Sequence, residues 1–266
     1  MARSVFHGRR LVLAHRGGSG LAPENTLAAF DKGLALGADG LELDVHLSRD
    51  GRVVVHHDRT LDRTTDRRGL VADHTADDLA RADAGHRFER RGSFPFRGQG
   101  LGVPLLADVL VRYRDVPIVI ELKVNAPELA RALVDVVRRA NAVDRVCVGS
   151  FGLRVLRAVR GLEPALATSA AREEVRWALY RSWCRWPVSR VPYRCYQVPE
   201  WSGRTHVVSP RFVAAAHAAG LPVQVWTVDN EIDAQRLLDW GVDALITDRP
   251  DLIVPVVGGK ADVRSE

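Results

Sequence analysis

The sequence predicts an α/β protein, a single (β/α)8 TIM barrel. The first observation is that short apolar runs alternate with longer amphipathic patterns, which is typical of parallel strands joined by helices. The second is the length of 266 residues, which suffices for one barrel of this kind. The third is a composition of 46% hydrophobic and 27% charged residues, which is ordinary for a globular protein and excludes disorder as the main state.

The predicted strands are short apolar runs, as expected for strands buried on both faces of a sheet. In chain order they are Leu11–Ala14, Gly40–Val45, Arg52–His56, Pro117–Leu122, Arg145–Gly149, Ala165–Thr168, Arg194–Val198, Val223–Val228 and Ala244–Thr247. A TIM barrel uses eight strands. One of the nine is therefore an extra strand or a misreading, and Arg194–Val198 has the weakest pattern.

Helical patterns lie between most of these strands. In chain order they are Asn25–Leu36, Leu105–Tyr113, Glu128–Asn141, Leu153–Gly161, Glu173–Trp183, Pro210–Ala219 and Glu231–Trp240. The first follows Pro23 and Glu24, and a proline and an acidic residue near the first turn favour a helix start. We interpret Glu24 and Asn25 mainly as residues of that start.

The barrel is predicted to span residues 11–255, with short tails at 1–10 and 256–266. Residues 60–102 are rich in Asp, Arg and Gly and are predicted to be a loop-rich insertion after the third strand. A barrel can carry such a segment over its active face.

The second and third predicted strands are joined by too few residues for a helical crossover. We therefore expect an antiparallel hairpin that turns at Asp50-Gly51. A four-residue loop sets Glu42 opposite His57, and a two-residue loop sets Asp44 opposite His57. Either register puts His57 on the face of both carboxylates, whereas a slip of one residue would substitute His56.

Ionisable side chains gather at three predicted strands. They are His15 and Arg16, Glu42 and Asp44, and Glu121 and Lys123. A histidine, an arginine and three carboxylates from different strands are the parts of a metal-assisted phosphoester site. Three carboxylates without cysteine form a hard oxygen site that favours Mg²⁺ or Ca²⁺.

The same residues lie in a longer series of motifs. These are His-Arg-Gly at 15–17, Pro-Glu-Asn-Thr at 23–26, Gly-Leu-Glu-Leu-Asp-Val at 40–45, His57-Asp58 followed by Leu61, Arg63, Thr64 and Thr65, Glu-Leu-Lys at 121–123, Val-Trp-Thr-Val at 225–228 and Thr-Asp-Arg-Pro at 247–250. In order and spacing the chain closely resembles the glycerophosphodiester phosphodiesterase family, from residue 11 to about residue 252.

The resemblance implies a TIM-barrel hydrolase of glycerophospholipid metabolism that cleaves glycerophosphodiesters into sn-glycerol 3-phosphate and an alcohol, using a divalent cation. Carried over, Glu42, Asp44 and Glu121 are the metal ligands, and His15 and His57 are the acid–base pair. Arg16 clamps the phosphate and Lys123 contacts it. In related barrels a substrate hydroxyl attacks first, so we expect a cyclic phosphate intermediate.

Other positions stay open. Trp226 either lines the glycerol pocket or packs in the core at a strand end. Asp248 either orients a ligand or begins the turn after the last strand. Glu42 and Asp44 by themselves also fit a half-exposed strand with one solvated face, but together with the histidines and the motif order they favour the site.

Residues 176–194 interleave tryptophan and tyrosine with arginine. One interpretation is peripheral membrane contact or an entrance for lysophospholipids, which would make the enzyme a lysophospholipase D. The interpretation we favour is a helix packed on the barrel by its tryptophans, with the arginines facing water. A third hypothesis is a non-catalytic barrel that binds phosphodiesters.

Charge, cysteine content and the first residues of the chain indicate which partners and which cellular location to expect. The net charge of +5 suits an anionic substrate, but the arginines form no compact stripe, so we expect no nucleic-acid partner. The three cysteines lack zinc or disulfide spacing and are expected to be idle thiols. Residues 1–10 lack the apolar core of a secretory signal, and we expect a cytoplasmic protein. The sequence predicts no oligomeric state.

Overall fold

The computed structural model describes residues 10–184, 186–187 and 190–258. The strands are β1 (Leu11–His15), β2 (Gly40–Leu47), β3 (Val53–Val55), β4 (Ile118–Leu122), β5 (Val146–Gly149), β6 (Ala167–Thr168), β7 (Tyr196–Pro199), β8 (Trp201–Ser202), β9 (Thr205–His206), β10 (Val223–Trp226) and β11 (Ala244–Thr247). The helices are α1 (Leu27–Ala35), α2 (Ala76–Ala80), α3 (Leu106–Arg112), α4 (Pro127–Arg139), α5 (Leu153–Leu162), α6 (Arg172–Trp183), α7 (Pro210–Ala218), α8 (Glu231–Asp239) and α9 (Pro250–Gly258), with a 3-10 turn at Val71–Asp73.

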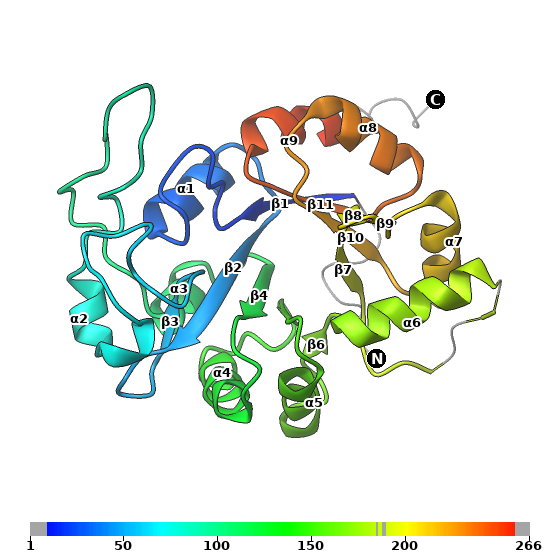
Figure 1. Cartoon of the computed structure of the whole chain (residues 1–266), viewed down its shortest axis with the longest axis horizontal. Helices are drawn as coiled ribbons and strands as arrows, with labels where there is room; N and C mark the ends of the chain where they lie inside the picture. The colour runs from blue at the N-terminus through cyan, green and yellow to red at the C-terminus, as the bar shows by residue number, and fades with distance from the viewer. Residues whose placement is uncertain (1–9, 185, 188–189, 259–266) are drawn as a thin grey trace.

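The main sheet confirms the predicted barrel. Parallel strands follow the order β6-β5-β4-β2-β1-β11-β10-β7, and β3 pairs antiparallel with β2 off this path. A parallel bridge between Ser169 and Cys195 links the chain beside β6 to the chain beside β7 and so joins the two ends of that order. The larger helices lie around the outside of the curled sheet (Figure 1).

Of the nine predicted strands, the extra one is β3. The sequence pattern favours Arg194–Val198 for that place. The prediction at Arg194–Val198 corresponds to β7, which pairs in parallel with β10 and is part of the barrel wall. β3 is the second arm of a hairpin and pairs with β2 off the strand order of the barrel. The seven predicted helices are confirmed as α1 and α3–α8, with ends that differ by at most two residues.

The hairpin register differs from both predicted registers. Its turn holds three residues, because the Ser48 N–H donates to the Arg52 carbonyl oxygen (2.9 Å) and Gly51 takes a left-handed φ of 74°. The Asp50 carboxylate fixes this turn by accepting from the Ser48 hydroxyl (2.7 Å) and from the Ala76 N–H (2.9 Å). The ladder therefore continues with His56, and not His57, beside Asp44, and the His56 N–H donates to the Asp44 carbonyl oxygen.

The inner face of the barrel changes from apolar to ionisable along β1 and β4. Leu11 and Leu13 of β1 lie with Val119 and Ile246 in a buried cluster inside the barrel. Because side chains alternate along a strand, the next inward position on β1 is His15. The same alternation after Val119 leads to Glu121. On both strands, therefore, every second side chain faces the inside of the barrel. The first of these side chains are apolar, and the last one is ionisable.

Two larger apolar clusters fill the space between the sheet and its helices. One involves β2, β4 and β5 with α1 and α3–α5, and the other involves β7, β10 and β11 with α6–α9. Residues 60–102 pack separately, around a small apolar cluster that includes Leu61, Val71 and Leu79. Of these residues, α2 lies at the outer side of the molecule in Figure 1.

The predicted packing of residues 176–194 by tryptophans is wrong. α6 is anchored by Ala178, Leu179 and Ser182. Its tryptophans Trp177 and Trp183 are 54% and 55% exposed, and Trp186 is 57% exposed. Small side chains let the helix lie close to its neighbours, so the bulky rings remain outside. Residues 185, 188 and 189 of this prediction lie outside the described residues.

The ends of the chain and the cysteines complete the fold. α9 continues to Gly258, past the predicted boundary at 255, while residues 1–9 and 259–266 of the predicted tails lie outside the described residues. Cys147 and Cys195 are buried and Cys184 is exposed, all as free thiols. Within the described part of the chain, no helix has the length and hydropathy needed to cross a membrane.

Candidate active site

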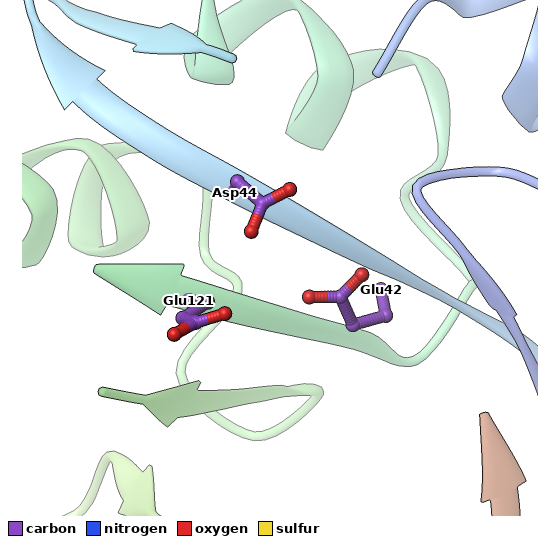
Figure 2. A group of neighbouring side chains, drawn as sticks. All are labelled: Glu42, Asp44 and Glu121. Carbon is purple, nitrogen blue, oxygen red and sulfur yellow. The ribbon is translucent and has the colours of Figure 1, made fainter. Parts of the chain in front are cut away.

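Three carboxylates from two neighbouring strands meet at the inner face of the barrel. Glu42 and Asp44 are two residues apart on β2 and point the same way, and Glu121 on β4 is the register partner of Asp44. One ligand oxygen from each lies within 4.8 Å of the other two (Figure 2). We call these three residues the carboxylate cluster. Their spacing suits a single hard cation.

The electrostatics of the carboxylate cluster favour a bound cation. Burial, followed by repulsion from Asp44, raises the pKa of Glu42 to about 8. Burial also raises the pKa of Glu121. Burial opposes ionisation of Asp44 too, but Lys123 and Arg16 outweigh it, so the pKa of Asp44 is lowered. Asp44 Oδ1 is buried and accepts no hydrogen bond from the described residues.

Two cationic side chains flank the carboxylate cluster. Lys123 Nζ lies 3.3 Å from Glu121 Oε2 and 3.4 Å from Asp44 Oδ1. Arg16 Nε lies 3.3 Å from Asp44 Oδ2, and the Arg16 backbone N–H donates to Glu42 Oε2 (3.1 Å). Arg16 has a left-handed φ of 51°, an uncommon conformation for a residue with a side chain. The turn after β1 therefore directs both the backbone and the side chain of Arg16 at the carboxylates.

His15 stands at the end of β1, beside Glu42 in the parallel register. Its Nδ1 lies 2.6 Å from Asp248 Oδ1, and its Nε2 lies 3.8 Å from Glu42 Oε2. The Ser19 hydroxyl also donates to Asp248. Burial opposes the charged imidazolium, but Glu42 and Asp248 outweigh it, so the pKa of His15 is raised. The hydrogen bond with Asp248 turns Nε2 toward the carboxylate cluster.

His57 reaches the site because the chain leaves the ladder after β3. It lines the same cavity as His15, and its Nδ1 lies 2.6 Å from Asp58 Oδ1. His56 is buried instead, with Nε2 3.0 Å from the Thr60 carbonyl oxygen. Burial lowers the pKa of His57, against the opposing charge of Asp44. The predicted choice of His57 over His56 thus agrees with the side-chain placement, although the predicted registers are wrong.

The Arg63 guanidinium forms hydrogen bonds with two carboxylates next to the site. Arg63 donates to both oxygens of Glu24 (2.7 Å each) and to both oxygens of Asp58 (2.6 and 3.1 Å). Glu24 in turn accepts from Arg16 Nη1 (3.0 Å). Asp58 and Arg16 are therefore linked through two residues, Arg63 and Glu24.

The structure adds residues to the site whose roles the sequence did not predict. Asn25 Nδ2 donates to Asp44 Oδ2 (2.9 Å), and Asp248, left open above, orients His15. In the sequence, Asp58 and Arg63 appear only as parts of a motif. Paired side chains 39 residues apart, such as Glu24 and Arg63, leave no local pattern, so position within the motifs is the only signal of their role.

The predicted residues line one cavity of about 750 Å³ at the mouth of the barrel. Those that line it are His15, Arg16, Glu42, His57, Glu121, Lys123 and Trp226. Asp44 lies behind this lining and is almost fully buried. Trp226 is half-buried and meets Phe151 edge to face, with ring centroids 5.9 Å apart. An oxygen cluster, two oriented imidazoles and two cations around one cavity can bind and cleave a phosphodiester.

Comparison with known proteins gives consistent results. The model of the glycerophosphoryl diester phosphodiesterase family matches residues 15–252. A glycerophosphodiester phosphodiesterase of Caldanaerobacter subterraneus is 33% identical over 94% of this chain and 98% of that protein. Another, from Bacillus altitudinis, is 34% identical over 92% of this chain and 97% of its own length.

Two solved structures extend the similarity to the whole fold. A glycerophosphodiester phosphodiesterase of Agrobacterium tumefaciens has a TM-score of 0.76 at 30% identity, covering 94% of this chain and 100% of its own. A phosphodiesterase of Oleispira antarctica in complex with the product sn-glycerol-3-phosphate has a TM-score of 0.75 at 28% identity, covering 94% of this chain and 97% of its own.

Proposed function

Because the chain belongs to the glycerophosphoryl diester phosphodiesterase family and is an enzyme of that class, we propose that it hydrolyses soluble glycerophosphodiesters to sn-glycerol 3-phosphate and an alcohol in a cation-dependent reaction. The observation that carries the proposal is the carboxylate cluster flanked by His15 and His57 at one cavity. The product complex of the Oleispira antarctica relative supports the same product here.

Glu42, Asp44 and Glu121 are proposed to hold a Mg²⁺ or Ca²⁺ ion. The donor set is all oxygen, and Asp44 Oδ1 is buried and accepts no hydrogen bond from the part of the chain that the structure describes, so the residues present fit a hard cation. When bound, the ion would polarise a phosphoryl oxygen and offset the negative charge of the transition state.

His15 and His57 are proposed as the acid–base pair. The glycerol 2-hydroxyl attacks phosphorus while one imidazole takes its proton, and the other imidazole protonates the departing alkoxide as the P–O bond to the alcohol breaks. Water then opens the cyclic phosphate with the two roles exchanged. Asp248 and Asp58 each hold Nδ1 of their histidine, which leaves Nε2 of each ring for the substrate.

Arg16 and Lys123 are proposed to bind the phosphate, and Trp226 to line the pocket for the substrate. Both cations line the cavity and lie within 3.4 Å of a cluster carboxylate, so they are placed beside any oxygen bound there. The Arg16 guanidinium can grip two phosphate oxygens at once. Trp226 offers the apolar wall that a glycerol backbone can lie against.

A second candidate is a lysophospholipase D that works at a membrane surface. The observation that favours it is the exposure of Trp177 and Trp183 on α6 and of Trp186 just beyond it. The same helix contributes Val175 and Leu179 to the cavity lining. Aromatic rings with nearby arginines suit an interfacial contact. Sedimentation with phosphatidylglycerol vesicles that is abolished in a Trp177→Ala/Trp183→Ala variant would support it, and no sedimentation of the wild type would exclude it.

The proposed function is tested with EDTA, Mg²⁺ or Ca²⁺ present. Release of glycerol 3-phosphate is measured from glycerophosphocholine and glycerophosphoethanolamine, and release of lysophosphatidic acid is measured from lysophosphatidylcholine. Metal-dependent release from the soluble diesters is expected. Activity on the lysolipid alone, as lysophosphatidic acid plus choline, would favour the second candidate. Equal release from the soluble diesters in EDTA after exhaustive dialysis would overturn the role of the cation.

A further inference from the structure

The cavity extends well past the carboxylate cluster. Beyond it, the lining continues over the start of α6, with Arg172, Val175 and Arg176, and over the small hairpin of β8 and β9, with Trp201 and Thr205. A volume of about 750 Å³ exceeds what a glycerol phosphate needs. This second part of the cavity is called the outer wall below.

The outer wall is positively charged. Arg172 and Arg176 are both exposed and line it from one helix face, one turn apart. Among the described residues that line the cavity, the carboxylates are Glu42 and Glu121, and both belong to the carboxylate cluster. A cationic group bound along the outer wall therefore meets like charge and finds no acidic partner there.

Phe151, Trp201 and Trp226 are aromatic residues of the cavity lining. Trp201 stacks on His206, with ring centroids 4.1 Å apart, and Phe151 is engaged by a cation. The Arg172 guanidinium lies 4.9 Å from the centroid of the Phe151 ring, and Trp226 packs against the same ring edge to face. A quaternary ammonium group is recognised mainly through free aromatic faces. To bind at Phe151, such a group would have to displace Arg172.

We propose that Arg172 and Arg176 select the alcohol half of the substrate by charge, so that an anionic alcohol is preferred to a quaternary ammonium alcohol. This inference rests on the proposed function, in which the glycerol 2-hydroxyl must lie at the histidines and the carboxylate cluster. The phosphate fixes the other end of the glycerol. The alcohol that leaves then points along the outer wall.

The test compares three diesters of glycerol 3-phosphate whose alcohols are choline, glycerol and 3-hydroxypropionate, at saturating metal and low ionic strength. The measured quantity is the ratio of kcat/KM for the 3-hydroxypropionate diester to that for the choline diester. Comparing this ratio between variants cancels the intrinsic difference between the two leaving groups. Exposed charges interact weakly, so an Arg172→Glu/Arg176→Glu variant is expected to lower the ratio by roughly tenfold.

Arg139→Glu is the matched control. Arg139 is exposed at the C-terminal end of α4, outside this cavity, and its reversal changes the net charge of the protein without changing the outer wall. The Arg172→Gln/Arg176→Gln variant should give an intermediate ratio, and added salt should compress all the differences. Arg139→Glu should hydrolyse the glycerol diester at the wild-type rate.

The possible outcomes distinguish failure of charge selection from failure of the proposed function. If all three diesters are hydrolysed and the double reversal changes the ratio no more than Arg139→Glu does, charge selection by α6 is wrong while the proposed function stands. If the wild type hydrolyses none of the three in the presence of Mg²⁺ or Ca²⁺, the proposed function fails, and the inference fails with it.

Discussion

At the scale of single residues, each histidine in the site is defined by its hydrogen-bond partner. His15 and His57 both contact an aspartate through Nδ1 at 2.6 Å, although one partner is 233 residues away and the other is the next residue. His56, adjacent to His57, contacts a backbone carbonyl and is buried. The chemistry of an imidazole here depends on which group its second nitrogen meets.

Alanine substitutions of His56 and His57 should have different effects, one on stability and the other on catalysis. His57→Ala is expected to lower kcat by about 10²- to 10⁴-fold, because it removes a proton-transfer group while leaving the fold intact. His56→Ala is expected to lower the free energy of unfolding by about 1–3 kcal/mol, because it removes a buried side chain and its hydrogen bond with the half-buried Thr60. Turnover and urea unfolding are measured for both variants. Near-wild-type turnover of His57→Ala would contradict the proposed role of His57 in proton transfer.

Asp248→Asn tests the orientation of His15. An amide accepts from Nδ1–H less strongly than a carboxylate and can donate to it instead, which favours the wrong tautomer. The expected loss in kcat is about 10²-fold with little change in KM. Asp108→Asn, at an exposed position on α3, is the control. Loss of activity through KM alone would mean that Asp248 binds substrate and does not orient His15.

At the scale of elements, the β2–β3 hairpin sets where the ladder stops beside the carboxylates. Its register places His56 beside Asp44, and His57 enters the site where the chain leaves the ladder after β3. The three-residue turn of the hairpin depends on Gly51 in the left-handed region and on the contacts of Asp50. A turn one residue longer or shorter would move the other face of β3 toward the carboxylates, because side chains alternate along a strand. The hairpin is therefore a structural requirement of the site, although β3 is no part of the barrel wall.

Two glycine substitutions test this turn against an ordinary helix. A Cβ on Gly51 would meet open space, so Gly51→Ala carries only the backbone cost of a left-handed residue, about 1–2 kcal/mol of lost stability. Gly161 also faces open space but lies within α5, where alanine is expected to stabilise by about 0.5–1 kcal/mol. Urea unfolding should give opposite signs, and a shared sign would contradict the turn geometry.

At the scale of the whole molecule, barrel closure brings distant parts of the chain into one site. β1 pairs with β11 and with β2, so His15 lies between Asp248 near one end of the chain and Glu42 in the next strand. The carboxylate cluster then places two buried acids and one half-buried acid together. Their mutual repulsion makes the unliganded site less stable than it would be with a cation bound.

Metal binding should accordingly be visible as thermal stability. At a cation concentration about 100 times its Kd, binding to the folded state alone adds about 2.7 kcal/mol. This amounts to a rise in Tm of roughly 5–10 °C for a domain of this size. Glu121→Gln keeps the shape of the side chain but removes one charged ligand, and most of the rise should disappear. A Tm that is unchanged by Mg²⁺, Ca²⁺ or EDTA in the wild type would contradict the proposed metal site.

The sequence by itself determined the barrel, its seven predicted helices and the ionisable side chains that the structure brings together at the cavity. It did so because strand and helix periodicity are local, and because His15, Glu42, Asp44 and Glu121 fall at fixed steps along buried strands. Only the tertiary structure decided the hairpin register, the membership of β7 and the exposure of the tryptophans on α6. Those depend on hydrogen bonds and packing between segments far apart in the chain, which no local pattern records.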